Sequence, residues 1–365
     1  MKIIVTANRV FTGLDWLPDH AVITEKGKIV DVLPTVSLPP DSLISDHSFA
    51  IVPSFIDIQI YGAAGKLFSL HPSVETLHLM NKHCISGGTH YFLPTVATNS
   101  PEVIKKSIKA IKEYWAMSGK GVAGLHLEGP WINKIKKGAH EERYISAPNA
   151  LELNKLLDEG AGVIKMITLA PECCPASIIE LIRSRGIVIS AGHSNADFAE
   201  AIVSFDNGIR TVTHLFNAMS PLHHREPGIP GAVFQHAQVM ASIIADGHHV
   251  HYELISIAKK LMCSRLFLIT DAVTETNEGL YRHHFEGDRY THDGILSGSC
   301  LTMIKAVLNC IRFSGISEEE ALRMASVYPA KVLDLDHKLG LIKKGYEAQL
   351  TFLDQNWEVI VPDFS

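Results

Sequence analysis

Short apolar runs rich in β-branched residues recur through the middle of the chain, and polar or helix-forming stretches separate them. Eight runs have this character: residues 55–60, 89–95, 122–127, 163–169, 187–191, 211–216, 239–245 and 265–270. Near-continuous apolar runs are typical of parallel strands that are buried on both faces. Helical patterns lie between most of them, at 101–115, 150–159 and 175–184, and Asn99-Ser100 before Pro101 is a typical helix start.

Eight strands that alternate with helices over roughly 280 residues predict a (β/α)8 barrel, a fold of about 250 residues. A doubly wound open sheet is the alternative, because strand order is not visible in a sequence. The two ends of the chain differ from the middle. Short β-like runs lie at 3–6, 21–24 and 28–33, separated by the turn signals Pro18-Asp19 and Lys26-Gly27, and further runs lie at 349–353 and 357–361. These two tails could pair into one small sheet domain.

Composition removes several function classes. The chain has 365 residues, 46% hydrophobic and 20% charged, with a net charge of −6, which argues against disorder and against nucleic-acid binding. No apolar run reaches the roughly 18 residues that span a bilayer, and the N-terminus does not resemble a signal peptide. The six cysteines form no CxxC pair, which favours a reduced, cytoplasmic setting. The 20 histidines prompt a search for a metal site.

Polar residues gather where the predicted strands end. In chain order they are Gln59, Tyr61, His126, Glu128, His193, His214, Asp246, His248, His249 and Asp271. A barrel places the carboxyl ends of its strands on one face, where the active sites of this fold lie. Residues more than a hundred positions apart are therefore expected to meet there.

One carboxylate and two imidazoles are a typical three-ligand set for a catalytic metal, and Glu128, His193 and His214 fit it. Zn²⁺ is the expected ion for such mixed ligands, with Fe²⁺, Mn²⁺ and Co²⁺ allowed. Taken singly, each histidine is equally typical of a core or surface position, and Glu128 of a buried ion pair. Asp271, at the end of the last strand, is either a general base and acid beside the metal or the N-cap of a following helix.

The role of Arg225 stays open, and two histidine pairs receive none. Arg225, in a loop beyond the sixth strand, is either a clamp for a phosphate or carboxylate or an ordinary surface charge. The pairs His223-His224 and His283-His284 are typical of exposed loops and receive no role.

Several ordered motifs resemble those of the N-acetylglucosamine-6-phosphate deacetylases, a family of the amidohydrolase superfamily. They include Leu125-His126-Leu127-Glu128-Gly129-Pro130, Ala191-Gly192-His193-Ser194-Asn195-Ala196, Thr213-His214-Leu215-Phe216-Asn217-Ala218-Met219 and Thr270-Asp271-Ala272. The match runs in order through Pro53-Ser54-Phe55-Ile56-Asp57 near the start to Leu296-Ser297-Gly298-Ser299 near the end. The blocks together are much more specific than any one alone.

The resemblance implies a barrel domain of residues 51–338 and a small β-sandwich domain of residues 1–50 plus 339–365. It implies that Glu128, His193 and His214 bind the metal, that Asp271 is the general base and acid, and that His140 polarises the acetyl carbonyl. The implied substrate contacts are Gln59, Ala139, His140, Asn217, the backbone of Ala218, Arg225 and His249. Members are usually homodimers in which some phosphate contacts cross the interface.

Two departures from the family pattern matter. Many superfamily members have a His-x-His after the first strand that holds a second metal, whereas this chain has Gln59 and Tyr61, so one tightly bound metal is expected. Glu141-Glu142-Arg143 replaces the segment expected after His140, which leaves the choice between gluco and galacto epimers open. Two other functions remain as alternatives, an amidohydrolase for a different amide and a catalytically silent barrel that senses sugar phosphates.

Overall fold

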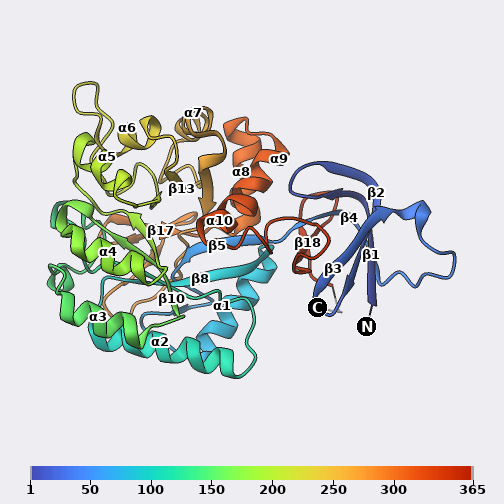
Figure 1. Cartoon of the computed structure of the whole chain (residues 1–365), viewed down its shortest axis with the longest axis horizontal. Helices are drawn as coiled ribbons and strands as arrows, with labels where there is room; N and C mark the ends of the chain where they lie inside the picture. The colour runs from blue at the N-terminus through green and yellow to red at the C-terminus, as the bar shows by residue number, and fades with distance from the viewer. Residues whose placement is uncertain (1, 363–365) are drawn as a thin grey trace.

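The protein is described by a computed structural model that covers residues 2–362, and Figure 1 shows a barrel ringed by helices beside a small sheet that holds both termini. The eight-stranded sheet of the barrel has the order β14-β13-β12-β11-β10-β9-β8-β5. Its strands are β5 (Phe55–Ile60), β8 (Thr89–Ala97), β9 (Leu125–Glu128), β10 (Ile164–Leu169), β11 (Val188–Ala191), β12 (Thr211–Val212), β13 (Met240–Ile244) and β14 (Leu266–Ile269). All eight predicted strands are therefore confirmed, although β12 is shorter than its apolar run.

The first and last strands of this sheet meet. The Asp271 amide donates to the Gln59 carbonyl at 3.0 Å, and the Tyr61 amide donates to the Ala272 carbonyl at 2.9 Å. Neighbouring strands are parallel and follow the chain order without a reversal. A doubly wound sheet would reverse its strand order at a switch point, so this alternative is wrong and the barrel is confirmed.

Helices cover the outside of the barrel. They are α1 (Val74–Ser86), α2 (Pro101–Ala116), α3 (Ala150–Glu159), α4 (Ala176–Ser184), α5 (Phe198–Asp206), α6 (Gly228–Gln235), α7 (Tyr252–Met262), α8 (Met303–Ser314), α9 (Glu318–Ala325) and α10 (Val327–Val332). The start of α2 follows the sequence signals, because the Ser100 side chain accepts from the Val103 amide and Pro101 occupies the first turn. Its buried residues Ile104, Ile108 and Ile111 recur at helical spacing and form the face toward the sheet.

The two tails pair into one six-stranded sheet, as the sequence allows. The sheet has the order β19-β18-β4-β1-β2-β3. Its strands are β1 (Lys2–Phe11), β2 (Trp16–Glu25), β3 (Lys28–Pro34), β4 (Asp46–Pro53), β18 (Leu350–Leu353) and β19 (Val359–Ile360). The exact boundaries of the two domains stay a prediction. Lys26-Gly27 forms the expected turn, but the turn expected at Pro18-Asp19 is wrong, because both residues lie inside β2 and Asp19 is accommodated with a φ of +48°.

An insertion between β14 and α8 was not anticipated. It contains β15 (His284–Phe285), β16 (Arg289–His292) and β17 (Ile295–Ser299), which form a separate three-stranded sheet. A small hairpin of β6 (Gly62–Ala63) and β7 (Lys66–Leu67) follows the first barrel strand. Within residues 2–362, no helix combines the length and the apolar character needed to cross a membrane.

Candidate active site

A cavity of about 240 Å³ opens among residues that follow the barrel strands. Its lining brings together four residues predicted from strand ends, Glu128, His193, His214 and Asp271. Further lining comes from the loop at Gly138, Ala139 and His140, from Asn217, Ala218 and His249, and from the insertion at Val273, Tyr281, His283 and 295–298. Tyr61, Leu67, Ser69, Ala97 and Ile244 complete it. The prediction that distant residues meet at one rim is confirmed.

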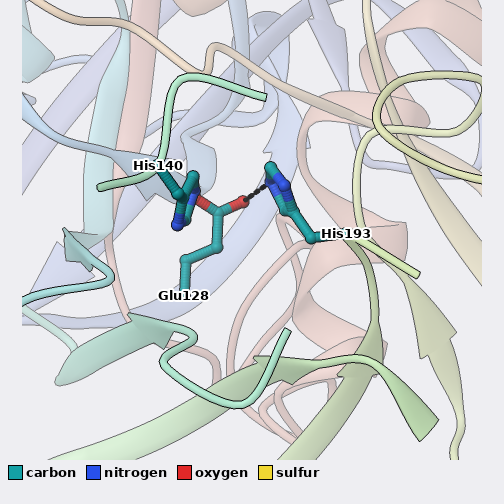
Figure 2. A group of neighbouring side chains, drawn as sticks. All are labelled: Glu128, His140 and His193. Carbon is teal, nitrogen blue, oxygen red and sulfur yellow. Dashed lines mark hydrogen bonds and ion pairs between the residues drawn. The ribbon is translucent and has the colours of Figure 1, made fainter. Parts of the chain in front are cut away.

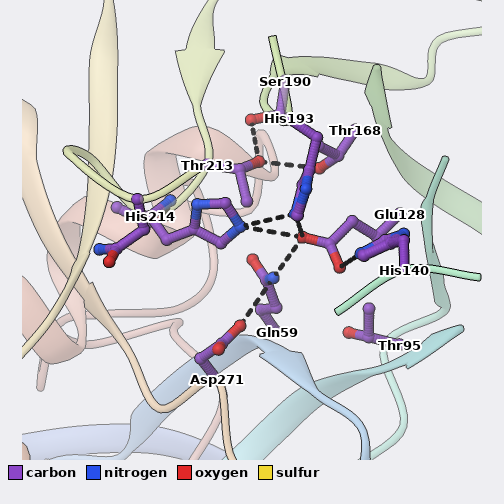
Figure 3. Close-up of polar contacts among 12 residues, drawn as sticks. Gln59, Thr95, Glu128, His140, Thr168, Ser190, His193, Thr213, His214 and Asp271 are labelled. Carbon is purple, nitrogen blue, oxygen red and sulfur yellow. Dashed lines mark hydrogen bonds and ion pairs between the residues drawn. The ribbon is translucent and has the colours of Figure 1, made fainter. Parts of the chain in front are cut away.

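Three donor atoms of the predicted ligand set converge on one point (Figure 3). Glu128 Oε1 lies 3.1 Å from His214 Nε2 and 3.2 Å from His193 Nε2, and the two nitrogens are 3.2 Å apart. A tetrahedral ion with bonds of about 2.1 Å holds its ligand atoms roughly 3.4 Å apart. The spacing of these three atoms therefore fits a divalent cation with little rearrangement.

The tautomer of His193 suits the same role. Its Nδ1 lies 2.9 Å from the Lys136 carbonyl oxygen, which only accepts, so Nδ1 carries the proton and the lone pair is on Nε2. His214 is placed by its backbone amide, which donates to Ser242 Oγ at 2.8 Å. Its buried Nδ1 has no hydrogen-bond partner among the described residues. The ring nitrogen of His214 that has a partner is therefore Nε2, which faces Glu128.

His140 also approaches Glu128, but from the other side (Figure 2). Its Nε2 lies 3.0 Å from Glu128 Oε2, whereas His193 and His214 lie against Oε1. Glu128, His140 and His193 have donor atoms within 4.8 Å of one another and so form a second possible ligand group. The mutual contacts at Oε1 favour His193 and His214 as the histidine ligands and leave His140 beside them.

The electrostatics of this cluster differ from residue to residue. Burial opposes ionisation of Glu128, but the neighbouring imidazoles of His193 and His140 outweigh it and hold the pKa of that carboxyl well below its usual range. Burial, together with the adjacent imidazole of His193, lowers the pKa of His140 to about 4. His140 is therefore a neutral ring at physiological pH, which can donate one hydrogen bond and accept another.

Gln59 lies in β5 and Tyr61 directly follows that strand, and both side chains approach buried carboxylates. The Gln59 amide nitrogen lies 3.0 Å from Glu128 Oε1 and 2.9 Å from Asp271 Oδ1, so it bridges two buried carboxylates. Tyr61 donates its hydroxyl proton to Glu128 Oε2 at 2.5 Å. Gln59 is 1% exposed and lies behind the residues that line the cavity, so its predicted contact with substrate stays a prediction.

Asp271 faces the cavity instead of capping a helix. No helix begins within the residues that follow it directly, since the next is α8 at Met303, and the N-cap alternative is wrong. Burial and the negative charge of Glu128 raise the pKa of Asp271 well above its usual range. A carboxyl whose pKa is raised in a cleft can both take up and release a proton at neutral pH.

The backbone around these residues is strained in a way that directs the side chains. His193, His214, Ala218 and Asp271 have φ values of +47°, +35°, +48° and +54°, in the left-handed region that non-glycine residues rarely adopt. Such residues cluster at functional sites, where the surrounding fold holds them in place. At each strand end the chain thus turns sharply and points a side chain or a peptide group into the cavity.

The residues predicted to bind substrate fall into two groups. Ala139, Asn217, Ala218 and His249 line the cavity, and His249 Nδ1 lies 2.6 Å from the buried carboxylate of Asp246. Arg225 does not join them, because it is exposed in the loop before α6. Its predicted contact with an anion stays a prediction for the single chain.

Sequence reasoning missed several residues of the site. His283 is 5% exposed and lines the cavity, so the expectation of an exposed loop is wrong for it, while His284, His223 and His224 are exposed as expected. Thr98 and Tyr281 both lie beside His140. A single threonine or tyrosine in a sequence gives no sign that it belongs to an active site. His126, by contrast, is a core residue whose Nδ1 and Nε2 bond to the Ile58 carbonyl and the Thr168 hydroxyl.

Comparison with known proteins gives one consistent picture. Residues 50–365 match the amidohydrolase family, and residues 4–46 match the NagA composite domain. The chain is 33% identical over 363 residues to an N-acetylglucosamine-6-phosphate deacetylase of Haemophilus influenzae, covering 96% of this chain and 95% of that one. It is 30% identical over 370 residues to an N-acetylgalactosamine-6-phosphate deacetylase of Escherichia coli O157:H7, covering 98% and 97%. The crystal structure of N-acetylglucosamine-6-phosphate deacetylase from Pasteurella multocida superposes with a TM-score of 0.94 at 34% identity, covering 98% and 97%.

Proposed function

Because the chain belongs to the amidohydrolase family, we propose that it hydrolyses the acetamide of N-acetylglucosamine 6-phosphate to glucosamine 6-phosphate and acetate. The observation that carries the proposal is the convergence of Glu128 Oε1, His193 Nε2 and His214 Nε2 beside Asp271 in one cavity. Relatives that match nearly the whole chain carry the name of this enzyme.

Glu128, His193 and His214 would hold one divalent cation, with Zn²⁺ the expected ion and Fe²⁺, Mn²⁺ and Co²⁺ as alternatives. When bound, this cation supplies the Lewis acidity that makes water a nucleophile at neutral pH. Gln59 and Tyr61 already bond to Glu128 and Asp271, which supports a single metal.

The chain's own residues would carry the proton and the developing charge. Asp271 takes a proton from the attacking water and then delivers it to the amide nitrogen, so that the amine leaves and acetate remains. His140 donates the proton on Nε2 as a hydrogen bond to the acetyl oxygen while negative charge develops there. The raised pKa of Asp271 suits a group that must also act as the acid.

The sugar and its phosphate would be held by Ala139, Asn217, the backbone of Ala218, His249 and Arg225. The first four line the cavity, whereas Arg225 projects from an exposed loop. We therefore infer a homodimer in which Arg225 of one copy reaches the cavity of the other. Guanidinium groups bind phosphate with two parallel hydrogen bonds, so one arginine suffices to anchor the substrate.

A mixed dimer tests this arrangement. One chain carries Asp271→Asn and keeps Arg225, and the other carries Arg225→Ala and keeps Asp271. If Arg225 acts across the interface, the mixed dimer contains one intact site and recovers about half of the wild-type activity on the phosphorylated sugar. Activity no higher than the sum of the two variants measured separately would show that Arg225 serves its own chain.

The galacto epimer is a second candidate, because one curated relative at 30% identity is named for N-acetylgalactosamine 6-phosphate. The segment that departs from the family pattern, Glu141-Glu142-Arg143, does not line the cavity, whereas Gly138, Ala139 and His140 just before it do. Glu142–Tyr144 form a short 3-10 helix.

Acetate release is measured with both hexosamine phosphates on zinc-loaded protein. A kcat/KM at least tenfold higher for the gluco epimer supports the proposal. Higher turnover of the galacto epimer would reassign the substrate, and tight binding of both sugars without acetate would indicate a sensor instead of an enzyme.

A further inference from the structure

The two ring nitrogens of His140 have different partners, and this difference fixes where its proton lies. Nε2 is 3.0 Å from Glu128 Oε2, and Nδ1 is 2.8 Å from Thr98 Oγ1. An ionised carboxylate only accepts hydrogen bonds, whereas a hydroxyl both donates one and accepts others. A neutral ring that bonds to both partners must therefore carry its proton on Nε2, and Nδ1 must accept a hydrogen bond from the Thr98 hydroxyl.

We propose that Thr98 is a positioning residue whose hydroxyl holds His140 in the tautomer with the proton on Nε2. The inference rests on the proposed function, in which the Nε2 proton is the one donated to the acetyl oxygen. In the opposite tautomer Nε2 would present a lone pair to that oxygen, and the two would repel each other. Thr98 thus acts through His140 and does not itself touch the reacting atoms.

Among residues 2–362, the Thr98 hydroxyl has one other hydrogen-bond acceptor besides His140. Its Oγ1 lies 3.3 Å from the Glu128 carbonyl oxygen, which is 0.5 Å farther than the 2.8 Å to His140 Nδ1. The shorter contact is expected to take the single hydroxyl proton, because hydrogen bonds weaken with distance. The ring of His193 packs against that of His140, with the two centroids 4.2 Å apart.

The surroundings hold Thr98 in place from two sides. The residue is 1% exposed at the end of β8, and the Tyr281 hydroxyl of the insertion donates to its carbonyl oxygen at 2.5 Å. Gly129 passes so close that a Cβ at this position would lie 2.1 Å from Thr98 Oγ1. The φ of +86° at Gly129 is also one that glycine adopts most readily. A side chain at position 129 would therefore collide with the Thr98 hydroxyl, and glycine leaves the room that this hydroxyl occupies.

The test compares Thr98→Val, which removes the hydroxyl and keeps the shape, with Thr98→Ser, which keeps the hydroxyl. Thr95→Val is the matched control, since Thr95 is buried on the same strand and bonds to the Leu93 carbonyl and the Ile60 amide. We expect Thr98→Val to lower kcat by 10- to 100-fold with KM and bound metal within twofold of wild type. Thr98→Ser and Thr95→Val are expected to stay within threefold in kcat.

A second readout does not depend on turnover. Zinc-loaded protein labelled with ¹⁵N-histidine reports which ring nitrogen carries the proton, and His140→Gln assigns the signals. Wild type and Thr98→Ser are expected to show a protonated Nε2 and an unprotonated Nδ1, and Thr98→Val a mixture. A wild-type ring with its proton on Nδ1, or on both nitrogens, would overturn the proposal, as would unchanged kcat in Thr98→Val. If wild type released no acetate, the proposed function would fail, whereas the spectrum would still decide the role of Thr98.

Discussion

Replacing Asp271 with asparagine separates chemistry from structure at this site. The side chain is buried, and its Oδ1 accepts a hydrogen bond from the Gln59 amide at 2.9 Å. Asparagine has the same shape, and its own Oδ1 can accept the same bond. Asp271 is not one of the three proposed metal ligands, so the variant is expected to bind metal as wild type does.

The magnitude follows from the role of a group that moves protons. A positioned general base and acid contributes about 10²- to 10⁴-fold to the rate. At about 1.36 kcal/mol for each factor of ten, this corresponds to roughly 3 to 5 kcal/mol of the barrier. The fold should not suffer, because burial and the charge of Glu128 already disfavour an ionised carboxylate at position 271. A neutral amide removes that cost, and we expect a melting temperature at least equal to that of wild type.

Acetate release under saturating substrate gives kcat, and elemental analysis of the dialysed protein gives the bound metal. Asp57→Asn is the control, because Asp57 is an equally buried carboxylate that bonds to Thr270 without lining the cavity. It is expected to keep kcat within about threefold. Asp271→Asn with kcat within tenfold of wild type and one metal per chain would refute the assignment of the proton carrier.

Three further outcomes follow from the same geometry. Arg225→Ala is expected to lower kcat/KM for the phosphorylated sugar by about 10² while leaving the weak hydrolysis of free N-acetylglucosamine unchanged, and equal losses on both would exclude a phosphate contact. Removing the metal with a chelator should abolish acetate release and lower the melting temperature, because a ligand that binds only the folded state stabilises it. Added Zn²⁺ should restore both. An unchanged melting temperature would contradict the proposed metal site. Burial lowers the pKa of His283 from 6.5 to about 4, so its contribution to stability is complete above pH 6.5 and is lost as the pH falls toward 4. The loss amounts to about 3 kcal/mol, and His283→Gln should therefore lose less stability than wild type between pH 7 and pH 4.5 in chemical denaturation; parallel curves would show that the ring already titrates normally.

The sequence predicts the barrel because its strands are buried on both faces. Runs such as 164–169 and 266–269 contain enough β-branched and aliphatic residues to be recognised without any partner. The sheet of the insertion was not predicted from the sequence because its strands are short and lie at the surface. His284–Phe285 is exposed and Arg289–His292 is half-buried, so neither shows the contrast between apolar and polar positions that marks a strand.

The same contrast explains which site residues can be found. Glu128, His193 and His214 are conspicuous because each is a polar residue at the end of an apolar run, where a buried charge needs a reason. Thr98 directly follows β8, but threonine is common in strands and carries no charge. Tyr281 reaches the site from the insertion, whose path no local pattern reveals. Arg225 lies in an exposed loop, and its proposed contact with substrate involves a second copy of the chain, which no local pattern in one sequence can reveal.

The exact positions of the proposed metal ligands cannot be predicted from the sequence, because the folded backbone sets them. Two of the three proposed ligands, His193 and His214, sit in the left-handed region, where non-glycine residues cost roughly 1–3 kcal/mol each. Asp271, which comes after β14, carries the same penalty. A flexible loop would relax such residues, so the strain persists only because each follows directly on a strand packed into the fully buried core of the barrel. The alternating strands and helices therefore do more than carry the site. Their rigidity keeps two imidazoles and a carboxylate within about 3 Å of one another, the spacing expected of side chains that share one cation.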